Sequence, residues 1–266
     1  MPATALPPAI PVVPLAPFDR HTLNQLFFEA IDRFGPQEAL RAKRDGRWQS
    51  LTYREAELQV DQVAMLFEEW QLRPGDRIAI LSENRPEWAI VDYAALALGL
   101  IVVPIYPTLP ADQVEFILRD SGARVAFAST SAQLEKLLVI RTRLASLDRV
   151  LVFDTAAALA GIPSLDAVLE RVDESISSWG RQLRKRAYGV GAESLATIIY
   201  TSGTTGTPKG VMLTHDNIAS MLAATRQHGS LVTRPGMVAL SLLPLSHVLE
   251  RAADYYYWDS GVTIAY

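Results

Sequence analysis

One segment of the sequence, residues 200–211 (YTSGTTGTPKGV), combines the residue types that bind a polyphosphate. Gly203 and Gly206 let the backbone come close to a ligand, and successive N–H groups and hydroxyls can donate to phosphate oxygens. Lys209 adds a positive charge on a flexible stem. The hydroxyl residues of the segment are Thr201, Ser202, Thr204, Thr205 and Thr207. The sequence therefore predicts a phosphate-binding loop between two short, largely apolar strands.

The spacing in this segment differs from that of a Walker A loop, which needs G-x-x-x-x-G-K-[ST]. Counted from Gly203, the second glycine position holds Pro208, and Gly210 rather than Ser or Thr follows Lys209. A Gly/Ser/Thr-rich segment is ordinarily only a turn between strands. The Pro-Lys-Gly sequence and the apolar flanks favour a phosphate loop of another kind.

The segment 200–211 resembles, without a break, the signature loop of the adenylate-forming enzymes. These are the acyl-CoA synthetases, the luciferase-like enzymes and the peptide-synthetase adenylation domains. A second segment, 243–251 (LPLSHVLER), resembles the next motif of long-chain fatty-acid–CoA ligases, and its Glu250-Arg251 pair indicates long-chain substrates. The resemblance implies the N-terminal part of such a ligase, which uses ATP to form an acyl-adenylate and coenzyme A to form acyl-CoA.

The resemblance also implies a role for individual residues. Lys209 would neutralise the departing pyrophosphate, and His247 would lie beside the carboxylate and the α-phosphate, so both are candidate catalytic residues. The hydroxyl of Thr204 would reach Mg²⁺, which prefers oxygen ligands. The residues expected to bind ATP or AMP are Thr201, Ser202, Gly203, Thr204, Thr205, Gly206, Thr207 and Lys209.

A single histidine is a weak indication of a functional site, because a lone histidine is more often a core or cap residue. The motif around His247 favours a functional role for it. His21, His215 and His228 show no spacing typical of a metal site, so we interpret them as structural.

Composition limits the class of protein. The 266 residues are 49% hydrophobic and 20% charged, as in soluble globular proteins. The net charge of −4 lacks the basic character of a nucleic-acid-binding protein, and the lack of cysteine excludes disulfides and a thiol nucleophile. The longest uncharged apolar run, 93–107, is shorter than the roughly 20 residues of a membrane helix. We expect a cytoplasmic protein without a transmembrane segment, which a fatty substrate brings to a membrane surface.

The order of elements predicts an α/β fold. Asp45-Gly46 marks the turn of a small N-terminal hairpin over 39–53, and Thr22 and Thr52 begin capping boxes. We also expect the residues from Asn84 to Glu87 to cap a helix. From residue 77 onward, apolar strands alternate with helices, which predicts a mostly parallel sheet covered by helices.

We expect three parts in the chain. Residues 1–20 form an extended arm, residues 21–190 a first α/β subdomain with a connector, and residues 191–266 an incomplete second α/β subdomain with the phosphate loop. The basic residues of the connector are interpreted as a solvated helix face, with a patch for lipid or coenzyme A phosphates as the alternative. These residues are Arg181, Arg184, Lys185 and Arg186. The aromatic residues 255–258 are expected to pack in the core, with an acyl pocket as the alternative.

The resembling family is much longer than this chain. Its later motifs, a glutamate that helps to hold magnesium and a lysine on a mobile C-terminal domain, have no counterpart here. We therefore expect a fragment that is inactive alone; a homodimer of the intact parent is left open. Two alternatives stay open: another adenylate-forming enzyme, such as a fatty acyl-AMP ligase or an amino-acid adenylation domain, and a non-catalytic nucleotide- or lipid-binding protein.

Overall fold

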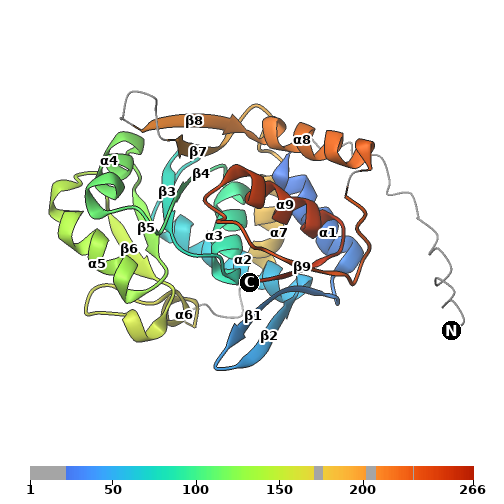
Figure 1. The fold of residues 1–266 in the computed structure, drawn as a ribbon, viewed down its shortest axis with the longest axis horizontal. Helices are drawn as coiled ribbons and strands as arrows, with labels where there is room; N and C mark the ends of the chain where they lie inside the picture. Colours follow the sequence, from blue (N-terminus) through green and yellow to red (C-terminus); the bar gives the residue numbers. More distant parts are fainter. Residues whose placement is uncertain (1–21, 171–175, 202–207, 230) are drawn as a thin grey trace, which may run out of the picture.

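The computed structural model describes residues 22–170, 176–201, 208–229 and 231–266 (Figure 1). The helices in these ranges are α1 (Leu23–Phe34), α2 (Tyr53–Glu69), α3 (Pro86–Ala97), α4 (Ala111–Ser121), α5 (Ser131–Ile140), α6 (Leu165–Leu169), α7 (Ile176–Ala187), α8 (His215–His228) and α9 (Val248–Asp259), with 3-10 turns at Arg141–Arg143 and Thr155–Ala157. The strands are β1 (Glu38–Arg44), β2 (Arg47–Thr52), β3 (Arg77–Leu81), β4 (Ile101–Ile105), β5 (Val125–Ala128), β6 (Arg149–Val152), β7 (Leu195–Thr201), β8 (Lys209–Thr214), β9 (Val238–Leu240) and β10 (Thr263–Ala265).

Six strands form one sheet in the order β6-β5-β3-β4-β7-β8. Its neighbouring strands run parallel except for β8, which is antiparallel to β7. Alternate side chains of β3 face opposite sides: Ile78 packs with α2 and α3, whereas Ala79 packs with α4 and α5. Every residue of β4 and β5 is buried because helices cover both faces (Figure 1). The predicted helix-covered, mostly parallel sheet is confirmed.

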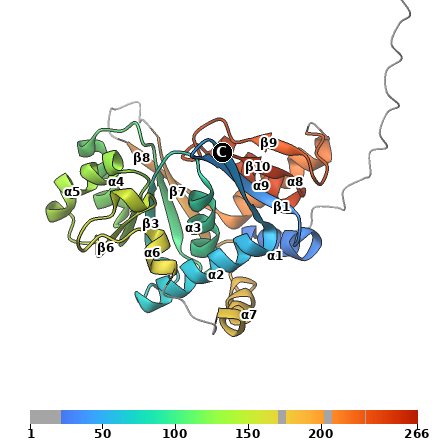
Figure 2. The same ribbon diagram turned by 90° about the horizontal axis from the view of Figure 1, so that it is seen from below.

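Four strands form a second sheet in the order β2-β1-β10-β9. The predicted hairpin is confirmed as β1 and β2, with positive φ angles of 48° at Asp45 and 76° at Gly46 in its turn. β10 runs parallel to both β1 and β9, so the hairpin pairs with a segment more than two hundred residues away. Helix α3 lies between the two sheets (Figure 2) and contributes to the core that they share.

The strands after residue 190 are divided between the two sheets. β7 pairs with β4 of the first sheet, whereas β9 and β10 join the hairpin in the second. The expected division into residues 21–190 and 191–266 therefore does not follow a boundary between sheets, and it stays a prediction. The expected arm, residues 1–20, lies outside the described residues.

Threonine capping boxes begin α1 and α2 as predicted, at Thr22 and Thr52. The predicted cap at Asn84 is wrong. Helix α3 starts at Pro86 with Arg85 as its N-cap, and no side chain bonds the first turn there. A proline at the start of a helix has no N–H to satisfy and already has the helical φ angle. The Asn84 side chain instead contacts the segment 241–245.

Two basic residues of the connector lie on α7 and form ion pairs with neighbouring helices. Arg184 pairs with Asp32 of α1, and Arg186 pairs with Glu68 of α2. Arg181 and Lys185 are exposed. This arrangement agrees with the interpretation of these residues as a charged outer face.

Aromatic residues of α9 pack in the core, as expected. Tyr255, Tyr256 and Trp258 are buried, and the Trp258 ring stacks on Phe27 with centroids 5.1 Å apart. In the described ranges, no helix is both long and apolar enough to cross a membrane.

Candidate functional site

A cavity of about 510 Å³ lies at the carboxyl ends of β4 and β7, beside α4 and the start of α9. In open α/β sheets ligands bind beyond the carboxyl ends of the parallel strands, so this is the expected edge for a site. The residues that line the cavity are Tyr106, Leu109, Gln113, Ile117, Ile199, Tyr200, Thr201, Pro208, His247 and Val248.

Both ends of the predicted phosphate loop lie at this cavity. Thr201 ends β7 and faces Lys209, the first residue of β8, across the antiparallel register. Thr201 and Pro208 line the cavity, and Lys209 is exposed beside them. The other predicted phosphate-binding residues, namely Ser202, Gly203, Thr204, Thr205, Gly206 and Thr207, lie outside the described residues. Their roles stay predictions.

Tyr200 fixes the base of the loop. Its hydroxyl donates a hydrogen bond of 2.6 Å to the Asp120 carboxylate at the end of α4. Burial, with the nearby Asp120 charge, raises the pKa of Tyr200, so the phenol stays protonated. A Cβ atom at Gly210 would lie 2.8 Å from Ile198 Cγ2 and 3.2 Å from Tyr200 Cζ. A side chain at Gly210, where β8 pairs with Tyr200, would therefore force its neighbours to move.

The sequence allowed two roles for His247, a helix cap and a functional residue. In the structure His247 caps a helix and also lines the cavity. It is the N-cap of α9, and its Nδ1 accepts a hydrogen bond of 3.2 Å from the Leu249 amide. In the neutral imidazole this leaves the proton on Nε2. The exposed ring can therefore donate a hydrogen bond from Nε2 to an anion in the cavity.

Arg251 is buried one turn after His247 on α9 and joins this helix to α3 and to β7 of the first sheet. It forms an ion pair with Asp92 of α3, and it donates to the Tyr255 hydroxyl at 2.8 Å and to the Thr197 hydroxyl at 2.7 Å. Glu250 accepts a bond of 2.9 Å from the Leu242 amide. The Glu250-Arg251 pair therefore has a structural role here, and the link to long-chain substrates stays a prediction.

His215 has the structural role expected from its sequence. It is fully buried, and its Nδ1 accepts a bond of 3.2 Å from the Leu23 amide, which joins α8 to α1. Burial, with the charge of Arg251, lowers the pKa of His215 to about 4. His228 is the last residue of α8, and His21 lies outside the described residues.

Magnesium was predicted on Thr204, which the structure does not describe. Among the residues that it does describe, no group of three His, Asp or Glu side chains is arranged to hold a metal ion.

Sequence reasoning missed three residues of this region. Tyr106 follows β4 directly, so its place after a predicted strand was a usable indication. Gln113 enters the cavity only because α4 packs over β4, and Asn84 reaches the histidine segment across a gap of 157 residues. No local pattern contains that information.

The fold and the cavity define an α/β protein with its site at the carboxyl edge of a parallel sheet. The chain belongs to the AMP-binding enzyme family, whose family model matches residues 27–266.

Two relatives show the extent of the similarity. The long-chain-fatty-acid–CoA ligase FadD15 of Mycobacterium bovis is 37% identical over 84% of this chain and 36% of its own length. The human long-chain-fatty-acid–CoA ligase ACSBG1 is 30% identical over 95% of this chain and 35% of its own length. The chain therefore spans little more than a third of the relatives that it matches.

A solved structure shows the same fold. A natural red-emitting luciferase from Phrixothrix hirtus superposes with a TM-score of 0.77, covering 92% of this chain and 46% of the luciferase, at 19% identity.

Proposed function

We propose that this chain carries the nucleotide- and carboxylate-binding half of a site that activates a long-chain fatty acid with ATP and transfers it to coenzyme A. One observation carries the proposal: Thr201, Pro208 and His247 line one cavity, with Lys209 beside it. Membership of the AMP-binding enzymes and the names of the relatives support the substrate class.

In the first step a carboxylate oxygen of the fatty acid attacks the α-phosphorus of ATP. The bond between that phosphorus and the bridging oxygen breaks, and pyrophosphate leaves with its negative charge. Two anions must meet, so positioning and preorganised donors supply most of the help. Lys209 neutralises the pyrophosphate, while the loop from Thr201 to Thr207 holds its oxygens. His247 donates from Nε2 to the reacting carboxylate or α-phosphate.

In the second step the sulfur of the coenzyme A thiol bonds to the acyl carbon and gives up its proton to water, the bond from that carbon to the adenylate oxygen breaks, and AMP leaves. For this step the chain would supply the apolar walls of the cavity, lined by residues such as Tyr106 and Ile117. A long-chain fatty acid partitions into membranes, so we expect a cytoplasmic protein that contacts a membrane surface. We retain a homodimer as a hypothesis for the natural length.

The proposal is tested by fatty-acid-dependent exchange of labelled pyrophosphate into ATP, with the protein at its natural length. Lys209→Ala should lower the exchange rate by about 100-fold or more, as expected for loss of one preorganised charge-stabilising donor. Lys185→Ala is the matched control, because Lys185 is an exposed lysine on α7. It should keep the wild-type rate.

Three results would contradict the proposal. Equal exchange in Lys209→Ala and wild type would remove the loop lysine from the reaction. Exchange that depends on an amino acid or acetate rather than on a long-chain acid would replace the substrate. Nucleotide binding with no exchange for any acid would favour a non-catalytic binding protein.

A further inference from the structure

The Asn84 side chain joins β3 to the segment that leads to His247. Its Nδ2 group donates to the Ser241 carbonyl at 3.1 Å, to the Ser241 hydroxyl at 3.1 Å and to the Leu243 carbonyl at 2.7 Å. Its Oδ1 accepts from the Leu245 amide at 2.8 Å. One side chain therefore contacts three residues of the strand-to-helix connection that precedes His247.

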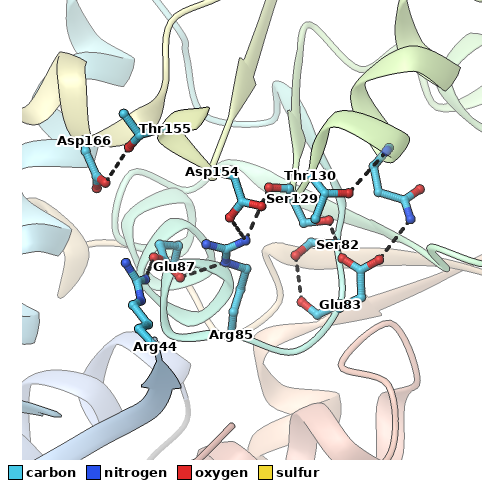
Figure 3. A network of polar contacts seen from close by, with 11 residues as sticks. Arg44, Ser82, Glu83, Arg85, Glu87, Ser129, Thr130, Asp154, Thr155 and Asp166 are labelled. Carbon is cyan, nitrogen blue, oxygen red and sulfur yellow. Dashed lines mark hydrogen bonds and ion pairs between the residues drawn. The ribbon is translucent and has the colours of Figure 1, made fainter. Parts of the chain in front are cut away.

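The neighbours of Asn84 are bound firmly on the other side, as Figure 3 shows. Glu83 accepts hydrogen bonds from Ser129, just after β5, and from Gln133 of α5. Arg85 donates to Asp154 and to Glu87, both at 2.9 Å. The segment that presents Asn84 is thus fixed to the carboxyl ends of β5 and β6.

The segment that Asn84 contacts is buried at Ser241 and Leu245 but exposed between them. Leu242 and Leu243 are 76% and 45% exposed, so apolar burial contributes little to their position. Further polar contacts lie at the two ends of the segment: Ser241 donates to Asp254 at 3.2 Å, and Ser246 donates to the Ile105 carbonyl at 3.1 Å. In the middle of the segment, Glu250 accepts from the Leu242 amide, and the Leu243 carbonyl accepts from Asn84.

We propose that Asn84 is the positioning residue of His247. By holding the segment 241–245, it sets where α9 begins and hence where the imidazole Nε2 points in the cavity. The proposal deepens the proposed function, on which its kinetic consequence rests. Asparagine suits the role because it offers two amide protons and one acceptor. Aspartate keeps the acceptor but turns a negative oxygen toward two carbonyl groups.

The first measurement does not depend on activity. Imidazole NMR spectra of the 266-residue chain are recorded for wild type, Asn84→Ala and Asn84→Asp, and the His247 signals are identified by their loss in His247→Gln. Both Asn84 variants should shift or broaden the His247 signals and leave the His215 signals in place. If Asn84→Ala does not fold, Asn84→Asp, whose side chain has the same shape as asparagine, shows whether Asn84 positions His247.

The second measurement is pyrophosphate exchange at the natural length. Asn84→Ala should lower kcat by up to about 100-fold, as expected for a misplacement near 1 Å, with KM for ATP almost unchanged. Asn24→Ala is the matched control, because Asn24 is buried in α1 and donates to the Leu96 and Ala187 carbonyls at 3.0 Å each. This control loses buried hydrogen bonds without touching the segment 241–245.

Unchanged His247 signals in both Asn84 variants would overturn the proposal. So would an equal loss of kcat in Asn24→Ala and Asn84→Ala, because that result means general destabilisation. If the wild type shows no exchange, the proposed function fails, and the NMR comparison still decides whether Asn84 positions His247.

Discussion

The two segments that border the cavity are held by different interactions. The phosphate-loop segment is a pair of antiparallel strands, β7 and β8, whose side-chain support at the cavity is the bond from Tyr200 to Asp120. The histidine segment has one backbone bond to a strand, from the Ser241 amide to the Ala265 carbonyl of β10, and is otherwise held by side chains, chiefly Asn84 and Glu250, with the buried Arg251 one turn further along α9.

This difference separates two ways of building one site. Backbone pairing of β7 with β8 positions the two ends of the loop, Thr201 and Lys209, without using their side chains. The histidine is positioned through side chains from α3 and from the segment after β3. The second arrangement is more sensitive to single substitutions, and the predictions below test that contrast.

The largest effect is expected at the buried support of the histidine segment. Asp92 and Arg251 are 1% and 2% exposed, so Asp92→Ala leaves an uncompensated buried charge. We expect the free energy of unfolding to fall by about 3–5 kcal/mol, measured by urea denaturation. A loss of unfolding free energy smaller than that of an exposed ion pair would show that Arg251 finds other partners or reaches water.

The support of α8, which follows the loop segment, is expected to depend on pH. The pKa of His215 falls from 6.5 to about 4 on folding, so between those values the unfolded chain binds a proton that the folded chain does not. Stability is therefore complete above about pH 6.5 and falls as the pH approaches 4, by about 3 kcal/mol in total. Urea midpoints at pH 7 and pH 4.5 measure this loss.

His215→Gln should remove this part of the pH dependence, whereas His228→Gln, at the exposed end of α8, should retain it. The same pH dependence in wild type and His215→Gln would contradict the assignment.

A smaller effect is expected within the strand pair. Gly210→Ala places a Cβ atom 2.8 Å from Ile198 Cγ2, so β8 must move away from β7. We expect a loss of about 1–3 kcal/mol, typical of overpacking, together with weaker ATP binding in titration calorimetry at the natural length. Gly191→Ala is the control, because its nearest contact, 3.6 Å from Ser194 Oγ, is ordinary. Equal losses in both variants would show that the crossing at Tyr200 is not tight.

The smallest effect is expected at the outer end of the network in Figure 3. Arg44 pairs with Glu87, but its side chain is 41% exposed and Glu87 also has Arg85. Arg44→Ala should cost less than about 1 kcal/mol and leave the His247 signals unchanged. A larger loss in thermal unfolding, or a shift of those signals, would mean that the network transmits force to Asn84.

Much of the fold could be predicted because its signals are local. The capping box at Thr22, the Asp45-Gly46 turn and the apolar strands each depend on neighbouring residues. The cap expected at Asn84 failed for the opposite reason. A side chain that is suitable for a helix cap is equally suitable for carbonyl groups brought near it by another part of the chain, and tertiary packing decided between them.

The sequence by itself determined the family of this protein, because the types and order of residues 200–211 and 243–251 form motifs that are legible without the fold, and from them it predicted a phosphate loop, a lysine and a histidine as the site. It also determined the class of fold, since hydrophobic periodicity is a local property. Only the tertiary structure decided that β7 lies beside β4, that Thr201 and His247 line one cavity, and that Asn84 supports the histidine segment. These contacts depend on how separate elements pack, and that information is distributed over the whole core.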